Sequence, residues 1–338
     1  MSGPASTPAS EPSAGVGARS AELAMRALQP TTIPWLLLVV VLAAISYEDP
    51  NFLTPDGFLA YLRTAAPLAL LAIGAYFVLA SGEFDLSVGS LVTVVVVVAA
   101  KLSDGDPANT IPVLLVLFAI GIAVGLFNGV CTTYLRVPSF IVTLATLLML
   151  SGAVFLWTGG APTGSLAENF RSIGREGITG VPLIDEIPYS VIVLAAFGGF
   201  GWWLSRGGFG RRVLAVGDND RAAALSGIAV HRVRIAAFVI SATSAILAGI
   251  VLAGFGGLSA QVGQGLEFQA ITAAVLGGTV LGGGKGSVPG AIAGALVLEA
   301  LFRLMTLYAV DSALQQTVTG IIIIAAVAVA GLRWRGNS

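Results

Sequence analysis

Long apolar segments alternate with short polar connections along most of this 338-residue chain. A helix of about 20 apolar residues is long enough to cross the hydrocarbon core of a membrane. The pattern predicts ten such crossings, at residues 31–47, 64–81, 86–101, 111–134, 138–157, 188–205, 232–254, 268–283, 287–306 and 312–332. We therefore expect an all-α integral membrane protein with about ten transmembrane helices in a single domain over residues 31–335.

The composition excludes an ordinary soluble domain. Hydrophobic residues make up 56% of the chain and charged residues only 10%, whereas about 25% of the residues in soluble proteins are charged. The formal net charge of −1 gives no basic face for nucleic acid. Residues 1–30 are rich in Ser, Pro, Ala and Gly, which predicts a disordered tail. Apolar sequence begins only near Ile33, too late for a typical signal peptide, so we expect the first apolar segment to remain in the membrane.

The distribution of basic residues predicts the orientation of the chain. With the N-terminus placed in the cytoplasm, ten crossings bring the C-terminus back there. Twelve of the 17 Lys and Arg residues then lie on the cytoplasmic side, as the positive-inside bias requires. The polar loop at 206–231 is then cytoplasmic and the segment 158–187 lies outside. The outer segment can hold a short helix around 166–173, and it is either a surface for a soluble partner or a simple connector.

The most polar part of the membrane domain lies between residues 206 and 234, with six arginines and the only histidine of the chain. Asp218–Asp220 offers capping oxygens to a helix that starts near Arg221. Gly227 is expected to end this helix, because glycine readily adopts the left-handed conformation found there. Such a short helix is marginal in water and needs a docking surface. That surface is either the membrane domain of this chain or another protein.

Two short polar or glycine-rich segments interrupt apolar runs, at Ser81–Ser90 and Gly282–Gly290. Irregular backbone at membrane depth is tolerated only where protein or a water-filled cavity satisfies its polar groups, and such breaks are typical of transport sites. In the first break, Glu83 and Asp85 could line a solute path and accept hydrogen bonds from hydroxyl groups. Alternatively, Asp85 or Ser87 caps the following helix and Glu83 lies in headgroup water.

Five further polar residues lie on apolar segments. Each could contact solute or join two helices by a hydrogen bond worth about 0.6 kcal/mol. They are Asn128, Ser139, Thr143, Gln269 and Thr272. A different pair, Glu299 and Arg303, is four residues apart and is expected to form an ion pair on one helix face.

The sequence carries no pattern of an enzyme or a metal protein. One cysteine, Cys131, and one histidine, His231, provide neither zinc spacing nor a catalytic triad. Lys285 follows a glycine, but Thr279 occupies the position of the first glycine of a phosphate-binding loop. We therefore expect no ATP hydrolysis, no metal and no cofactor in this chain.

Four segments in order resemble the permease subunits of bacterial ribose/xylose-type sugar ABC importers, within the branched-chain amino-acid/ribose permease superfamily. These segments are Asp85–Ser90, Val137–Leu144, Phe209–Val230 and Ala273–Ser287. The resemblance covers residues 33 to about 332 and implies an importer permease fold with a short cytoplasmic coupling helix. It also implies the cytoplasmic membrane of a bacterium as the location.

The resemblance implies three kinds of partner. A second permease copy, identical or paralogous, pairs with this chain above cytoplasmic ATP-binding subunits, which hold ATP and magnesium. A periplasmic or lipid-anchored sugar-binding protein delivers the solute from outside. The helix near 219–227 would enter a groove on the ATPase, with Arg211, Arg212 and Arg221 at the polar rim and Ala223, Leu225 and Ile228 as the apolar contact.

The resemblance and the polar pattern together define two sets of candidate residues. The ATPase-coupling set is Arg211, Arg212, Asp218, Asn219, Asp220, Arg221, Ala222, Ala223, Leu225, Ser226, Gly227 and Ile228. The translocation-pathway set is Glu83, Asp85, Ser87, Asn128, Ser139, Phe140, Thr143, Gln269 and Thr272.

The predicted function is translocation of a monosaccharide or similar polyol, driven by ATP on a partner subunit. Glu83-Phe84 stands where members of the family often carry Gly-Ile, and Gln269 stands where many carry Asp, so the identity of the sugar stays open. Two alternatives stay open as well. One is an ABC permease for branched-chain amino acids or another small solute, and the other is a secondary transporter in which Glu83, Asp85 or Glu299 carries a coupling proton.

Overall fold

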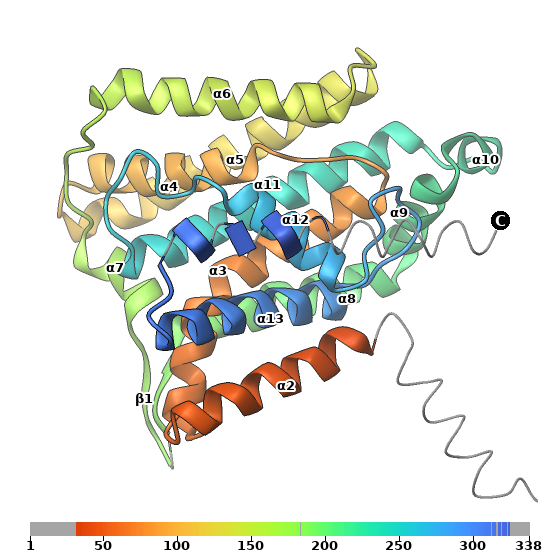
Figure 1. Ribbon diagram of the computed structural model, residues 1–338. Coiled ribbons are helices and arrows are strands. Elements are labelled where there is room, and N and C mark those ends of the chain that lie inside the picture. The colour runs from red at the N-terminus through yellow and green to blue at the C-terminus, as the bar shows by residue number, and fades with distance from the viewer. Residues whose placement is uncertain are drawn as a thin grey trace, which may run out of the picture.

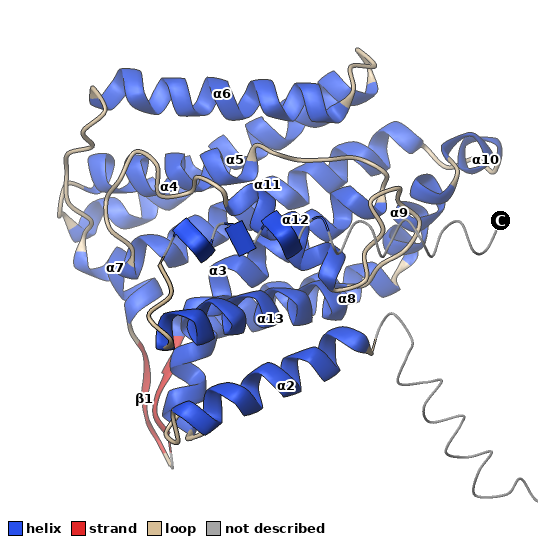
Figure 2. Ribbon diagram, viewed as in Figure 1, coloured by secondary structure: helices blue, strands red, loops and turns tan. Residues whose placement is uncertain are grey.

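The computed structural model describes residues 32–311 except Leu183, together with residues 313–315, 317–318, 320–322 and 324. The tail 1–30 and the greater part of the predicted crossing 312–332 lie outside these residues. Helices account for nearly all of the regular structure (Figure 2). The main apolar helices are α2 (Ile33–Glu48), α3 (Pro55–Ala80), α4 (Val88–Ser103), α5 (Thr110–Thr133), α6 (Ser139–Thr158), α8 (Tyr189–Arg206), α11 (Val230–Phe255), α12 (Leu266–Leu276) and α13 (Val288–Leu307).

Five helices in the described part of the chain are long and apolar enough to span a membrane: α3, α5 with the short 3-10 turn before it, α6, α11 and α13. Three further apolar helices, α2, α4 and α12, are shorter.

Helix α3 begins at Pro55, before the crossing that the sequence predicts from residue 64. The Thr54 hydroxyl accepts a hydrogen bond from the Gly57 N–H at 3.2 Å, and Pro55 occupies the first turn, where its missing N–H costs nothing.

The prediction of a full helical crossing at 268–283 is wrong. Helix α12 has 11 residues and ends at Leu276, so it is roughly 16 Å long against a hydrocarbon core of about 30 Å. The residues that follow include Gly278, Gly283 and Gly284 with φ between 76° and 90°, a backbone conformation that cannot continue a helix. A non-helical segment, residues 256–265, precedes α12, so this part of the chain is a half-length helix between two irregular segments.

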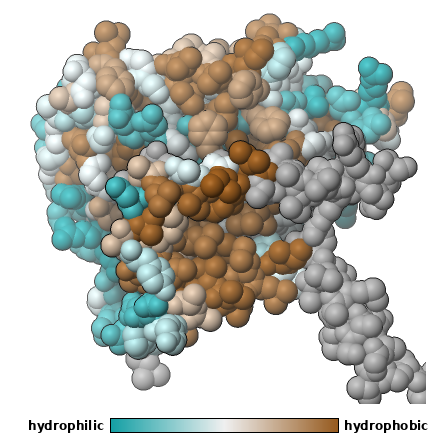
Figure 3. Space-filling view, in the orientation of Figure 1, coloured by the Kyte–Doolittle hydropathy of each residue, from teal (hydrophilic) through white to brown (hydrophobic). Residues whose placement is uncertain are grey.

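Helices α3 and α11 form the centre of the bundle. In the most apolar window of α3, 83% of the residues are buried, whereas the figure is 28% for α5 and for α6. Helix α6 lies on the outside of α4 and α5, and α2 lies beside α13 on the opposite side (Figure 1). The visible surface is apolar in its middle and hydrophilic toward both ends of the helices (Figure 3), as expected for a protein surrounded by lipid.

One end of the bundle carries α7 (Glu168–Arg175) and a hairpin of β1 (Gly177–Val181) and β2 (Ile184–Pro188). The helix expected around 166–173 is thus present two residues later. The antiparallel hairpin, which pairs Ile178 with Ile187, is a departure from the all-α expectation. Arg63 of α3 donates a hydrogen bond to the Arg175 carbonyl at 2.9 Å and joins this end to the bundle. The opposite end carries α9 (Gly208–Asp218) and α10 (Asp220–Leu225) (Figure 1).

Glycines allow the central helices to pack closely. A Cβ on Gly125 of α5 would lie 2.7 Å from the Cα of Val239 in α11, whereas a Cβ on Gly152 of α6 would meet no atom within 4 Å. We predict that Gly125→Val lowers the stability of the purified protein by about 1–3 kcal/mol, because the α11 backbone cannot move aside without strain. Thermal unfolding in detergent measures this effect. The matched change Gly152→Val should leave the midpoint nearly unchanged, and equal midpoints for both variants would contradict the packing of α5 against α11.

Candidate functional site

Asp85 lies at the centre of a buried polar cluster in the break between α3 and α4. One carboxylate oxygen, Oδ1, accepts hydrogen bonds from the Ser87 N–H at 3.0 Å and from the Ser87 hydroxyl at 2.6 Å. The other, Oδ2, accepts from the Ser241 hydroxyl of α11 at 2.8 Å. A buried carboxylate is tolerated when such donors surround it. Asp85 therefore holds the start of α4 against α11.

The cluster continues into α5 and α6. The Asn128 side-chain amide donates to the Ser87 hydroxyl at 2.9 Å, and the Thr146 hydroxyl donates to Asn128 Oδ1 at 2.6 Å. Thr146 is not among the residues predicted from the sequence. It follows Ser139 and Thr143 at helical spacing on one face of α6, and this periodicity is the signal that could have identified it.

Ser139 and Thr143 hold the break from the side of α6. The Ser139 hydroxyl accepts a hydrogen bond from the Phe84 N–H at 3.0 Å. The Thr143 hydroxyl donates to the Ser139 carbonyl at 2.8 Å and lies 3.4 Å from the Phe84 carbonyl. The structure thus brings Asp85, Ser87, Asn128, Ser139 and Thr143 of the predicted pathway set into one region.

Four residues of the pathway set lie outside the hydrogen bonds of this cluster. Glu83 makes a different contact, with Arg234 of α11. Phe140 is 53% exposed on the outer face of α6. Gln269 is half-buried on α12, and the buried Thr272 hydroxyl donates to the Phe268 carbonyl of the same helix at 2.6 Å. The structure therefore does not bring the whole pathway set together.

Glu83 forms an ion pair with a side chain of α11, a contact that neither of the two alternatives for this residue included. Its Oε1 lies 2.9 Å from Nε of Arg234 in the first turns of α11, and the two side chains are 12% and 22% exposed. The Nε–H does not meet hydrogen-bond geometry, so the contact is an ion pair only. Arg234 also lies 3.4 Å from Asp220 of α10. Because these residues are far apart in the sequence, no local pattern indicates the chain of charges from Glu83 to Asp220.

The short helix predicted near Arg221 is present as α10. Asn219 is its N-cap, and the Asn219 side-chain oxygen accepts a hydrogen bond from the Ala222 N–H at 2.9 Å. Gly227 follows the helix with φ of 80°. The exposed members of the coupling set are Arg211, Arg212, Asp218, Asn219, Asp220, Arg221, Ala222, Leu225, Ser226 and Gly227. The local helix prediction is therefore correct, whereas its role in coupling stays a prediction.

The predicted apolar contact of α10 needs correction. Leu225 is 91% exposed, but Ala223 is buried within this chain and Ile228 is half-buried against its hydrophobic core. Other parts of this chain thus cover two of the three apolar residues, and Leu225 is the one of the three that is free to meet a partner.

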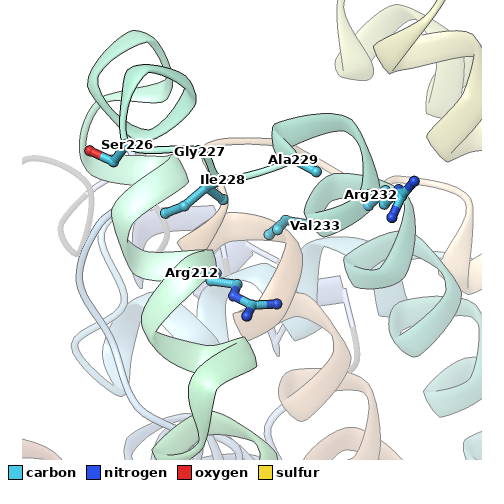
Figure 4. A pocket seen from close by; sticks show the side chains of 7 residues that line it. All are labelled: Arg212, Ser226, Gly227, Ile228, Ala229, Arg232 and Val233. Carbon is cyan, nitrogen blue, oxygen red and sulfur yellow. The ribbon is translucent and has the colours of Figure 1, made fainter.

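Beside α10 is a pocket of about 370 Å³ between α9, the connection from α10 and the start of α11. Figure 4 shows Arg212 and Arg232 on its two walls.

The end of α9 contacts both breaks of the chain. A Cβ on Gly217 would overlap the Ala80 carbonyl at the end of α3 and would lie 2.5 Å from the Gly284 nitrogen. The Gly284 N–H itself donates to the Ala80 carbonyl at 3.0 Å. Only glycine permits this approach of three backbone segments. The segment α9–α10 is therefore in direct contact with both interrupted regions.

The predicted ion pair between Glu299 and Arg303 is not observed. Arg303 pairs with Asp49 of the α2–α3 connection at 3.5 Å and lies 5.0 Å above the Phe52 ring, rather than pairing with Glu299. Asp49 is brought close because α2 packs beside α13. No group of three possible metal ligands occurs among the residues that the structure describes.

The chain belongs to the family described as branched-chain amino acid transport system / permease component, whose model matches residues 57–327. The resemblance noted from the four sequence segments is confirmed at the level of this family. Membership makes the chain a membrane permease component, which is a transport subunit and not an enzyme. The five membrane-spanning candidates agree with this class.

Relatives in this family are import permeases. The ribose import permease protein RbsC of Escherichia coli strain K12 is 35% identical over 299 residues, which cover 87% of this chain and 91% of that protein. The autoinducer 2 import system permease protein LsrC of E. coli strain K12 / DH10B is 33% identical over 292 residues, covering 86% and 84%. The protein of that name from Klebsiella pneumoniae is 35% identical over 288 residues, covering 85% and 81%. No solved structure matches the chain.

The pair Glu83–Arg234 can be tested by a double-mutant cycle. We predict that Glu83→Gln, Arg234→Gln and the double variant give a coupling energy of about 1 kcal/mol, because the charges are close but partly solvated. Thermal unfolding in detergent, calibrated by denaturant titration, measures it. The matched cycle with Asp220→Asn should give a smaller coupling energy, since the Asp220 side chain is 50% exposed. A coupling energy of zero for Glu83 and Arg234 would contradict the ion pair.

Proposed function

We propose that this chain is the permease subunit of an ATP-driven, binding-protein-dependent importer that moves a monosaccharide or similar polyol across the bacterial cytoplasmic membrane. Similarity to a ribose import permease and an autoinducer 2 import permease over more than four fifths of the chain supports an importer of small polar solutes. Substrate delivery and ATP hydrolysis are functions of partner proteins. The permease supplies the path and the conformational change.

The observation that carries the proposal is the contact of the α9–α10 segment with both breaks. Gly217 is wedged against Ala80 and Gly284, and Asp220 is linked through Arg234 to Glu83. A force applied to α10 therefore reaches the first break, which holds the Asp85 cluster, and the glycine segment before α13. Rigid helices joined at such irregular points are suited to alternate a central site between two sides of a membrane.

The exposed part of α10 is the proposed docking site of a cytoplasmic ATPase. Leu225 gives an apolar anchor, and Arg211, Arg212 and Arg221 give a positive rim that complements an acidic groove. The ATPase holds ATP and magnesium, and its closure moves α10 together with the two breaks. This assignment places the α9–α10 end, the coupling loop 206–231 and both chain termini in the cytoplasm.

The opposite end of the bundle is the proposed outer surface. The segment 158–187, with α7 and the hairpin, presents exposed polar residues there and would receive a periplasmic or lipid-anchored solute-binding protein. A second permease copy completes the path. Residues 31–335 act as one membrane domain behind the tail 1–30.

We predict that Leu225→Asp abolishes ATP-dependent uptake and the retention of the ATPase by the tagged permease, because a charge replaces the exposed leucine of α10 that is proposed as the apolar anchor. Leu225 makes no buried contact, so the variant should still reach the membrane. The measurement is co-purification of the ATPase, followed by uptake in proteoliposomes with the binding protein. The matched change Ile178→Asp, at an exposed apolar residue of β1, should leave ATPase retention unchanged.

Two results would contradict the proposal. One is full ATPase retention and uptake by the Leu225→Asp variant. The other is uptake by the permease alone, driven by a proton gradient and indifferent to ATP, which would identify a secondary transporter instead.

A further inference from the structure

A second polar region lies between α4, α6 and the start of α12, apart from the hydrogen bonds of the Asp85 cluster. It is a cavity of about 260 Å³. Its lining combines hydroxyl, amide and carboxylate groups with apolar side chains: Ser90, Thr93, Leu147, Leu148, Ser151, Phe155, Ala260, Gln261, Gln264 and Glu267. Six of these ten residues are polar, which is unusual for a space between membrane helices.

The cavity lies where two short helices begin. Glu267 is in the first turn of α12, and its Oε2 packs against Gly89 in the first turn of α4. The Gly263 N–H donates to the Thr93 hydroxyl at 3.0 Å and holds the segment before α12 against α4. The N-terminal ends of both helices thus lie near the Glu267 carboxylate, and their macrodipoles favour a negative charge there. The fold provides a reason for a carboxylate at this point but not a complete set of hydrogen-bond partners.

The Glu267 carboxylate is only half satisfied. The residue is 5% exposed. Its Oε1 accepts one hydrogen bond from the Gly265 N–H at 3.3 Å, whereas the buried Oε2 has no hydrogen-bond partner among the described residues. A buried polar atom without a hydrogen-bond partner lowers the stability of the folded state. A ligand that donates a hydrogen bond to Oε2 would recover this free energy.

We propose that this cavity is a binding site for a neutral solute with several hydroxyl groups, such as one monosaccharide ring, and that Glu267 accepts hydrogen bonds from its hydroxyls. The inference rests on the proposed function and names the chemistry of its solute site. The side chains of Ser151, Gln261 and Gln264 make no hydrogen bond within the described part of the chain, so they are free to donate and accept as hydroxyl groups require. Phe155 and Leu147 offer apolar area to the C–H face of a sugar ring.

The lining selects against anionic solutes. It contains no Lys or Arg, so a carboxylate on the solute would meet Glu267 without a compensating cation. An apolar solute would leave Oε2 unpaired. The volume is slightly below the roughly 300 Å³ at which drug-sized ligand sites begin, which limits the occupant to about one ring. A neutral polyol fits all three conditions.

The test uses the complete transporter, purified with its ATPase and binding protein and reconstituted in proteoliposomes. The probes are radiolabelled D-ribose, D-xylose, D-glucose and D-galactose. For a sugar that the wild type takes up, Glu267→Gln should lower uptake at least tenfold at low sugar concentration, since a charge-assisted hydrogen bond is lost. ATP hydrolysis stimulated by the binding protein should continue, which a collapse of the fold would prevent. Glu299→Gln, a half-buried carboxylate outside the cavity, should transport normally.

A cysteine experiment gives an independent result if Glu267→Gln does not fold. In a Cys131→Ala background, Ser151→Cys places a thiol in the cavity, and a neutral methanethiosulfonate reagent is added after reconstitution. Modification should stop uptake, and saturating amounts of the transported sugar should slow the modification. Gly152→Cys is the matched control, because its side chain would point into open space away from these contacts. Modification there should leave uptake intact.

The outcomes separate the two proposals. Lost uptake with continued ATP hydrolysis, together with sugar protection of the thiol, supports the cavity as the solute site. Normal uptake by Glu267→Gln, or a modified Ser151→Cys that still transports, overturns the inference and leaves the proposed function standing. Failure of the wild-type complex to take up any of the sugars overturns the proposed function of sugar import and this inference with it.

Discussion

Backbone that leaves helical conformation inside an apolar bundle must find its hydrogen-bond partners within the protein. This constraint explains the hydrogen bonds around the two breaks of the chain. In the first break, the Phe84 N–H bonds to Ser139 and the Ser87 N–H bonds to Asp85. In the second, the Gly284 N–H bonds to the Ala80 carbonyl. Ser139 is on α6 and Ala80 ends α3, and Asp85 in turn accepts a hydrogen bond from Ser241 of α11. The breaks therefore fix how α3, α6, α11 and the glycine segment sit against one another.

The same contacts support the mechanical role proposed for the breaks. The irregular segments are where the segment α9–α10, proposed for ATPase docking, touches the bundle. The end of α9 fits against both breaks at Gly217, and α10 reaches the first break through Arg234. Movement of α10 thus has a short physical route to the Asp85 cluster. The cavity beside Glu267 lies farther along α4, within reach of any displacement of that helix.

The sequence was sufficient for features that depend on local physical chemistry. Apolar length predicts most of the helices that the structure describes, and the capping residue Asn219 with Gly227 predicts α10. The sequence was insufficient where long-range contacts decide which charges are paired and which apolar side chains are buried. Arg234 looks like one more topology-setting arginine, yet it neutralises Glu83. Ala223 and Ile228 look like a free docking face, yet the chain itself covers them.

The half-length helix α12 shows a second limit. Its apolar sequence continues through residue 281, but the glycines after Leu276 adopt conformations that end the helix. Hydropathy indicates only that this segment is apolar. Whether it is one long helix or a short helix with an irregular connection depends on contacts with α13, α9 and α3, which bring Gly277 against Gly290 and Gly284 against Ala80. Glu267 is absent from the candidates predicted from the sequence for the same reason, because its burial depends on α4, which packs beside it.

The central claim is that α10 and the two breaks move as one unit when the ATPase closes. Electron paramagnetic resonance distances between spin labels test it directly in the reconstituted complex, with and without trapped nucleotide. Labels at Ser226 and Lys285 should keep the same separation in both states, whereas the separation of Ser226 from Gly152 on α6 should change. A change between Ser226 and Lys285 with no change toward α6 would contradict the account.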